Sequence, residues 1–169
     1  SIVKAEAKDA ALLSKLATQT FIESHGHSAP AADIEAYVNE KYTPEMMTAE
    51  LADPSNIYHI QYYHKLPIGF SKIVLNCPYD GSPVSSICKL ERIYLLKAYY
   101  GTNLGPALMD FLFHLMKKEK QTGTWLYVWK ENTRAIRFYE KKGFRIIGSF
   151  DFPISATHSN PNHRMLLEF

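Results

Sequence analysis

A loop with little side-chain bulk, YYGTNLGP, lies between two apolar stretches near the middle of the chain. It comprises Gly101, Thr102, Asn103, Leu104 and Gly105, followed by Pro106, where a helix is expected to begin. Successive backbone N–H groups before a helix N-terminus form a partly positive concavity that suits phosphate oxygens. Glycine lets a ligand approach the backbone, and Asn103 is a residue type that tolerates positive φ. The loop therefore indicates a phosphate-bearing ligand, with an ordinary strand-to-helix connection as the alternative.

Two common phosphate motifs do not fit this loop. A GxxxxGK[ST] loop is excluded because no lysine followed by Ser or Thr comes next, and the dinucleotide pattern GxGxxG is also missing. The loop alone thus suggests a phosphate without naming the molecule that carries it.

The histidines form no recognisable metal constellation. His25 and His27 stand in SHGHS without a nearby cysteine or third ligand, so we expect a polar loop there. His59 and His64 are expected at the surface of a hairpin, and His114 on the polar side of its helix. We predict no metal site.

The elements around the loop alternate in type. Residues 87–96 read as a strand, 106–121 as a helix and 124–130 as a strand, which implies a parallel pair joined by a right-handed crossover. Elsewhere we expect a strand and helix over 1–25, helices at 31–42, 44–53 and 132–143, a hairpin turning at Leu66–Gly69, and final strands at 144–152 and 163–169. The order predicts an α/β fold.

Composition narrows the class of protein. The 169 residues are 46% hydrophobic and 13% aromatic, which suits one domain over residues 1–169. A net charge of +2, with the basic residues spread along the chain, demands neither nucleic acid nor an anionic membrane as partner. No apolar run reaches the roughly 20 residues of a membrane span, and no apolar targeting region opens the sequence, so a cytoplasmic protein is expected. Cys77 and Cys88 are expected to be reduced thiols.

Two stretches together resemble the GCN5-related N-acetyltransferases. YGTNLGPAL has the shape of that family's acetyl-CoA loop, and NTRAIRFYEKKGF resembles its second signature, matched at Asn132, Ala135, Phe138, Tyr139, Gly143 and Phe144. The stretches LERIYL and WLYVWKENTRAIRFYEKKGF look closest to bacterial PaiA-type spermidine/spermine acetyltransferases. The resemblance implies a mixed, mostly antiparallel sheet with splayed parallel central strands and flanking helices, and acetyl-CoA as cosubstrate. Many proteins of this fold pair through their last strands, so a homodimer is allowed.

The chain departs from the family pattern in its cofactor loop. Tyr100 stands where the pattern has Gln or Arg, and Asn103 replaces the first patterned glycine. The backbone donors remain, but a charged contact to the pyrophosphate is lost. Two consequences are open: weaker affinity for the cofactor, or a charge supplied by Lys97 or Lys141. The resemblance implies a cofactor site at Ile93, Tyr94, Leu95, Tyr100, Gly101, Thr102, Asn103, Leu104, Gly105, Pro106, Asn132, Ala135, Phe138 and Lys141.

The resemblance also assigns catalytic roles. An amine arrives as an ammonium and must lose a proton before it attacks, and Glu91 matches the family's glutamate, acting through water. The alternative is a structural ion pair of Glu91 with Arg92 or a lysine. Tyr139 is the expected proton donor to the departing thiolate, or else a packing residue. The amide of Leu95 or its neighbour, at a bulge, would stabilise the charge on the thioester oxygen.

The acceptor is expected to be a small-molecule amine, a polyamine above all. Carboxylates on the early helices could hold its spare ammonium groups, or could serve solubility alone: Glu23, Asp33, Glu35 and Glu40. Two alternatives stay open. One is acetylation of a protein or peptide amino group, and the other is a CoA-binding sensor without catalysis.

Overall fold

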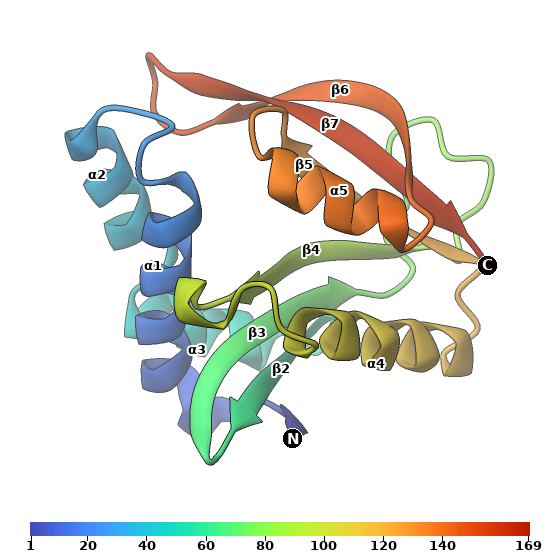
Figure 1. The fold of residues 1–169 in the computed structure, drawn as a ribbon, viewed down its shortest axis with the longest axis horizontal. Helices are drawn as coiled ribbons and strands as arrows, with labels where there is room; N and C mark the ends of the chain where they lie inside the picture. The colour runs from blue at the N-terminus through green and yellow to red at the C-terminus, as the bar shows by residue number, and fades with distance from the viewer.

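The computed structural model describes residues 1–169, which form a seven-stranded sheet with helices on both faces (Figure 1). The sheet order is β1-β2-β3-β4-β5-β7-β6, and every neighbouring pair is antiparallel except β4 and β5. The strands are β1 (Ile2–Lys4), β2 (Asn56–Tyr63), β3 (Leu66–Val74), β4 (Cys88–Leu95), β5 (Gly123–Trp129), β6 (Arg145–Pro153) and β7 (Ser159–Glu168). The predicted mixed, mostly antiparallel sheet is confirmed.

Two apolar cores lie on opposite faces of this sheet. The helices are α1 (Ala10–His25), α2 (Ala31–Lys41), α3 (Pro44–Ala52), α4 (Leu104–Lys118) and α5 (Thr133–Lys141). Helices α1 to α3 contribute to one core, and α4 and α5 to the other. Adjacent residues of β2 show the division, because Tyr58 packs in the first core and Ile57 against the second. None of the helices combines the length and apolar character that crossing a bilayer requires.

The parallel strands β4 and β5 separate almost as soon as they meet. They pair only at Cys88 with Thr124 and at Lys89 with Trp125, although both strands continue well beyond. Each strand keeps its other partner, since β4 pairs with β3 and β5 with β7. The predicted splay of the central strands is therefore present, with α5 in front of β5 in Figure 1.

A bulge in β4 lies earlier than the sequence suggested. Ile73 of β3 faces Leu90 and Lys72 faces Arg92, so Glu91 is the extra residue. The expected bulge at Leu95 is wrong, because Leu95 pairs regularly with Gly69. An extra residue breaks the alternation of side chains along a strand, so Glu91 and Arg92 both reach the α1–α3 face.

Three further expectations need correction. The hairpin turns at His64 and Lys65, with φ of 49° and 66°, so Leu66–Gly69 belongs to β3. Helix α4 begins at Leu104 instead of Pro106, and the positive φ of the loop falls on Gly101 (75°) and not on Asn103 (−76°).

The predicted surface position of His59 is also wrong, because only 5% of it is exposed. Strand β2 is an interior strand between β1 and β3, and the His59 ring packs against Phe111 of α4, with ring centroids 5.0 Å apart. His64 and His114 are exposed, as predicted, and Cys77 and Cys88 are free thiols.

A buried group of charges ties α3 to the sheet. Lys72 of β3 is 5% exposed, and its Nζ lies 2.6 Å from Glu50 Oε1 and also contacts Glu91 Oε2. Tyr58 Oη donates to Glu50 Oε1 at 2.8 Å and accepts from Arg92 Nη1 at 2.7 Å. These five residues, Glu50, Tyr58, Lys72, Glu91 and Arg92, are called the ion cluster below. The cluster holds two carboxylates and two cations in a space that excludes most water.

Replacing the central lysine of the ion cluster should cost much of the stability. Lys72→Met leaves Glu50 and Glu91 short of a buried partner, and we expect the free energy of unfolding in urea to fall by about 3 kcal/mol or more. The matched control is Lys8→Met, because Lys8 pairs with Glu6 at the surface and its side chain is 78% exposed, so a loss below about 1 kcal/mol is expected. Equal losses in the two variants would contradict a structural role for the cluster.

The same cluster predicts acid lability. Burial raises the pKa of Glu50 and Glu91, but their partners together, Lys72 foremost, lower both pKa values to a net position below the ordinary 4.5. Carboxyls whose pKa is depressed by folding stabilise the protein fully above the unfolded pKa, and this stabilisation disappears as the pH falls through the folded pKa. Urea unfolding from about pH 7 to about pH 3 should show a steady free energy that drops below about pH 4.5. A free energy independent of pH across this window would contradict the pairing.

Candidate active site

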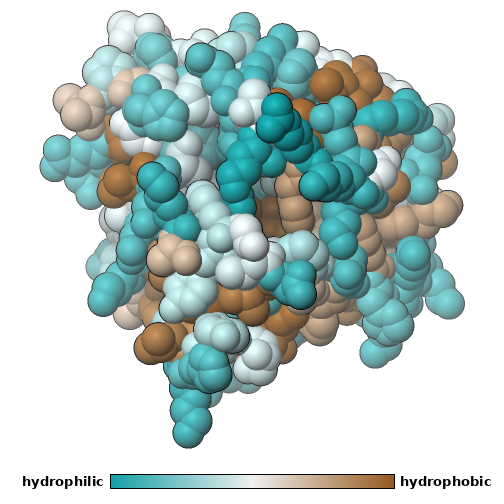
Figure 2. All heavy atoms as spheres, in the orientation of Figure 1, coloured by the Kyte–Doolittle hydropathy of each residue, from teal (hydrophilic) through white to brown (hydrophobic).

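One cavity of about 630 Å³ occupies the place where β4 and β5 part. It is lined by residues of β4 from Lys89 to Leu95, of β5 from Tyr127 to Trp129, and by side chains of α1, α2 and α5. Because these helices lie on opposite faces, the cavity runs through the sheet. Figure 2 shows apolar side chains at the bottom of a hollow near the middle of one face.

The α5 side of the cavity adjoins the loop before α4. The backbone amides of Gly101, Thr102, Asn103 and Gly105 have no hydrogen-bond partner within the protein. Gly101 takes the left-handed conformation that turns the chain, and Gly105 lines the cavity beside Leu95 and Phe138. Free donors at the start of a 15-residue helix fit a diphosphate, and the apolar gap behind them fits an extended acyl carrier.

A guanidinium stands over the aromatic ring that replaces the family's polar residue. Arg134 of α5 places its Cζ 3.7 Å from the centroid of the Tyr100 ring, and both residues line the cavity. Neither Lys97 nor Lys141, the two lysines considered from the sequence, lines it. Arg134 thus brings a fixed positive charge next to the loop that the sequence identified.

The cavity gathers ten of the sequence-predicted site residues. Its lining includes Glu91, Ile93, Tyr94, Leu95, Tyr100, Gly105, Asn132, Ala135, Phe138 and Tyr139. The lining does not include Gly101, Thr102, Asn103, Leu104, Pro106 and Lys141. Asn132 caps α5, because its Oδ1 accepts from the amide of Ala135 at 3.2 Å.

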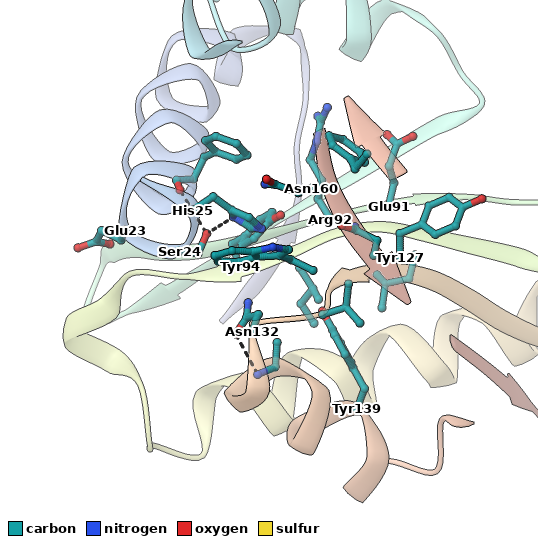
Figure 3. A pocket seen from close by; sticks show the side chains of 18 of the residues that line it. Glu23, Ser24, His25, Glu91, Arg92, Tyr94, Tyr127, Asn132, Tyr139 and Asn160 are labelled. Atoms are coloured by element: carbon teal, nitrogen blue, oxygen red, sulfur yellow. Dashed lines mark hydrogen bonds between the residues drawn. The ribbon is translucent and has the colours of Figure 1, made fainter. Parts of the chain in front are cut away.

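Tyr139 reaches the cavity from α5. Its side chain is 9% exposed and packs in the core shared by α4 and α5, and in Figure 3 it extends from the helix toward β4. Burial raises the pKa of the phenol well above its ordinary value, so the hydroxyl stays protonated at neutral pH. A protonated group in a dry site can act as a proton donor.

Glu91 and Arg92 lie on the other side of β4 from Tyr139 and Asn132 (Figure 3). Glu91 contacts Lys72 through Oε2 and lies 3.4 Å from Lys89 Nζ through Oε1. Although burial raises the pKa of this carboxyl, Lys72, Arg92 and Lys89 together lower it below its ordinary value, so Glu91 is charged at neutral pH. The structure therefore shows an ion pair of Glu91 with lysines and also places Glu91 at the cavity.

The backbone of β4 presents a donor to the gap. The amide of Leu96 donates to Ile68 O in β3 at 2.8 Å. Successive amides of a strand point to opposite edges, so the amide of Leu95 points toward the gap between β4 and β5. Leu95 also lines the cavity, where such a donor can meet a carbonyl oxygen.

His25 is a cavity residue that the sequence did not reveal. It ends α1 instead of lying in a polar loop, and its ring stacks on Phe21 with centroids 4.9 Å apart. Burial lowers the pKa of His25 to about 4, so the imidazole is neutral at pH 7. The signal available was its place four residues after Phe21, on the buried face of the helix.

Comparisons with known proteins agree with this geometry. Residues 16–144 match the model of the acetyltransferase (GNAT) family. An uncharacterized N-acetyltransferase of Mycobacterium bovis is 27% identical over 152 residues, which is 90% of this chain and 93% of that protein. The spermine/spermidine N(1)-acetyltransferase of Bacillus subtilis is 30% identical over 92 residues, 54% of this chain and 60% of that protein.

A solved structure shares the fold along the whole chain. The crystal structure of the PaiA N-acetyltransferase of Thermoplasma acidophilum in complex with coenzyme A superposes with a TM-score of 0.80 and 21% identity, covering 100% of this chain and 98% of that one. The matched segment includes both the loop before α4 and the cavity-lining helix α5. Because the family model matches most of its length, the chain belongs to the acetyltransferase (GNAT) family, whose members are acetyl-CoA-dependent N-acetyltransferases.

Proposed function

We propose that the chain transfers the acetyl group of acetyl-CoA directly to a primary amine of a small molecule while both are bound. The observation that carries this proposal is the single cavity that crosses the sheet where β4 and β5 part. Unpaired amides and Arg134 lie near one end, and the α1–α3 face provides separate space for an acceptor. A ternary complex needs such a passage, since the amine must meet the thioester without a covalent enzyme intermediate.

The residues around the cavity take distinct roles in the proposed reaction. Acetyl-CoA supplies the activated thioester. Glu91, through a water molecule, accepts the proton that the ammonium loses, so that the nitrogen lone pair can form the new bond to the acetyl carbon. The amide of Leu95 stabilises the negative charge on the acetyl oxygen. Tyr139 gives its proton to the sulfur as the carbon–sulfur bond breaks, and the second proton of the attacking nitrogen passes through water to the Tyr139 oxygen. The products are an acetamide and the free thiol of CoA.

A polyamine is one candidate for the acceptor. The activity of a relative supports it, because the B. subtilis protein is a spermine/spermidine acetyltransferase. The acidic residues that the sequence suggested as ligands for a polyamine give this candidate less support. Of Glu23, Asp33, Glu35 and Glu40, only Glu23 lines the cavity, and its carboxylate accepts from the amide of Lys97 at 3.0 Å.

The first expected outcome concerns the reaction itself. Thiol release from acetyl-CoA should rise at least about 100-fold over the no-acceptor rate with a suitable small amine, given the contribution of positioned acid–base groups. The assay compares spermidine, spermine, simple diamines, amino acids and a peptide with a free amino terminus. Turnover with the peptide alone would favour the protein-acetylating alternative. Binding of CoA without turnover on any amine would favour the sensor and contradict the proposal.

A second expected outcome concerns Tyr139. Tyr139→Phe keeps the packed ring but removes the proton, so kcat should fall about 100-fold while the KM for acetyl-CoA stays within about two-fold. Tyr62→Phe is the matched control, because Tyr62 lies outside the cavity lining. If both variants turn over like the wild type, Tyr139 is a packing residue and not a proton donor.

A third expected outcome concerns Glu91. Glu91→Gln removes the proton acceptor, and kcat should fall by about 10- to 100-fold, most strongly where the free amine is scarce at low pH. Glu140→Gln, on the exposed side of α5, is the control and should leave kcat unchanged. Melting temperatures of both variants separate a chemical effect from loss of the pair with Lys72. An unchanged kcat in Glu91→Gln would overturn the assigned role.

A further inference from the structure

The acceptor half of the cavity carries more positive than negative charge. Its lining on the α1–α3 side includes Lys41, Lys89 and Arg92. Lys41 lies 3.7 Å from Glu40 Oε1 and Lys89 lies 3.4 Å from Glu91 Oε1, so Arg92 is the cation in excess. Behind them, Lys72 and Glu50 offset each other, with 2.6 Å between Nζ and Oε1. The carboxylate of Glu23 lies at the other end of the cavity, next to the segment that leads to the loop. A bound group with negative charge is therefore favoured on the acceptor side.

Arg92 offers this side an open hydrogen-bonding edge. Its Nη1 donates to Tyr58 Oη at 2.7 Å and lies 3.6 Å from Glu50 Oε1. Its Nε and Nη2 donate no other hydrogen bond to a carboxylate or backbone carbonyl, and the Tyr42 hydroxyl is the further polar group close to the guanidinium. The guanidinium packs over the Tyr42 ring, with Cζ 5.0 Å from the centroid, which fixes its plane. A fixed edge with two parallel N–H donors matches the two oxygens of a carboxylate.

Aromatic side chains surround the remaining space. Phe21 and Tyr37 stack with centroids 4.7 Å apart, and Tyr127 and Phe150 likewise stack at 4.7 Å. All four line the cavity. These rings would pack well against an acceptor molecule whose middle part is apolar, with the reacting amine at one end and a charged group at the other.

We propose, on the basis of the acetyltransferase function above, that the preferred acceptor is a primary amine that also carries a carboxylate, bound by Arg92, as in an amino acid with an apolar side chain. A polycation fits this half poorly. Its extra ammonium groups would lie near Lys41, Lys89 and Arg92, and Glu91 is already engaged by Lys72 and Lys89. Arg92 is thus assigned as the residue that selects the acceptor.

Matched acceptor pairs test this assignment in the wild-type protein. We would measure kcat/KM for phenylalanine against phenylalaninamide and for leucine against leucinamide, with spermidine alongside. Each amide keeps the amine and the apolar body but lacks the negative charge. We expect each acid to exceed its amide by about 10-fold or more, as for a charge-assisted hydrogen bond that one partner cannot make. The amine of the amide is the less basic of the two, so reactivity alone would favour the opposite order.

The variant Arg92→Lys tests the residue. It keeps a positive charge for Glu50 and Tyr58 but lacks the planar fork, so the KM for the acids should rise about 10-fold, while the KM values for the amides and for acetyl-CoA stay unchanged. Arg145→Lys, whose side chain is 63% exposed, is the matched control and should match the wild type. If Arg92→Lys does not fold, the acid-to-amide ratio of kcat/KM in the wild type still decides whether the acceptor carries a carboxylate.

The outcomes separate the two proposals. Amides or spermidine used as well as the acids would overturn the carboxylate assignment and leave the acetyltransferase function standing. An equal loss on acids and amides in Arg92→Lys would make Arg92 structural and overturn its selective role. No transfer to any amine would instead contradict the proposed function.

Discussion

The separation of β4 from β5 is the constraint on which the rest of the structure depends. Hydrogen bonding between the two strands stops after Lys89 and Trp125. Each strand still pairs along its other edge, so the sheet holds together while one inner edge of each strand is released. Unpaired backbone groups inside a protein are costly unless a ligand or water satisfies them. The gap is therefore suited to bind a ligand. The cavity occupies it, and Leu95 and Tyr139 both line that cavity.

The ion cluster sets the chemistry on one face of that gap. The bulge at Glu91 brings two successive residues of β4 to the same face, where Lys72 and Glu50 hold them. This arrangement keeps Glu91 charged and fixes the guanidinium of Arg92 with one edge free. On the other face, burial keeps Tyr139 protonated. The sheet thus divides a charged side from an apolar side that holds the protonated phenol of Tyr139, which suits the reaction proposed above.

Much of this arrangement could be predicted from the sequence, because periodicity and signature residues are local. The strand–helix–strand order around residues 87–130 predicted the parallel pair, and the signature around Asn132 and Tyr139 predicted α5 and its place at the cavity. The features that escaped prediction depend on contacts between distant segments. The bulge at Glu91 is a matter of register with β3, and the burial of His59 follows from its strand lying inside the sheet.

The site residues that the sequence analysis missed depend on contacts between segments that are far apart in the sequence. Arg134 lies more than thirty residues from Tyr100, and only the fold places its guanidinium 3.7 Å from that ring. His25 belongs to no signature, and Arg92 was considered from the sequence only as an ion-pair partner of Glu91. Their places at the site appear only when α1 and β4 meet around one cavity. The acidic residues of the early helices were predicted to hold the acceptor together. Glu35 and Glu40 are instead exposed, because the opposite face of α2 packs on the protein, and the sequence alone does not show which face that is.

The most direct test of the central claim is a crystal structure of this protein grown with CoA. We expect the pantetheine arm to lie between β4 and β5, with the sulfur next to Tyr139 and the diphosphate on the free amides of the loop before α4. CoA bound outside the gap, or strands β4 and β5 paired along their whole length in the crystal, would contradict it.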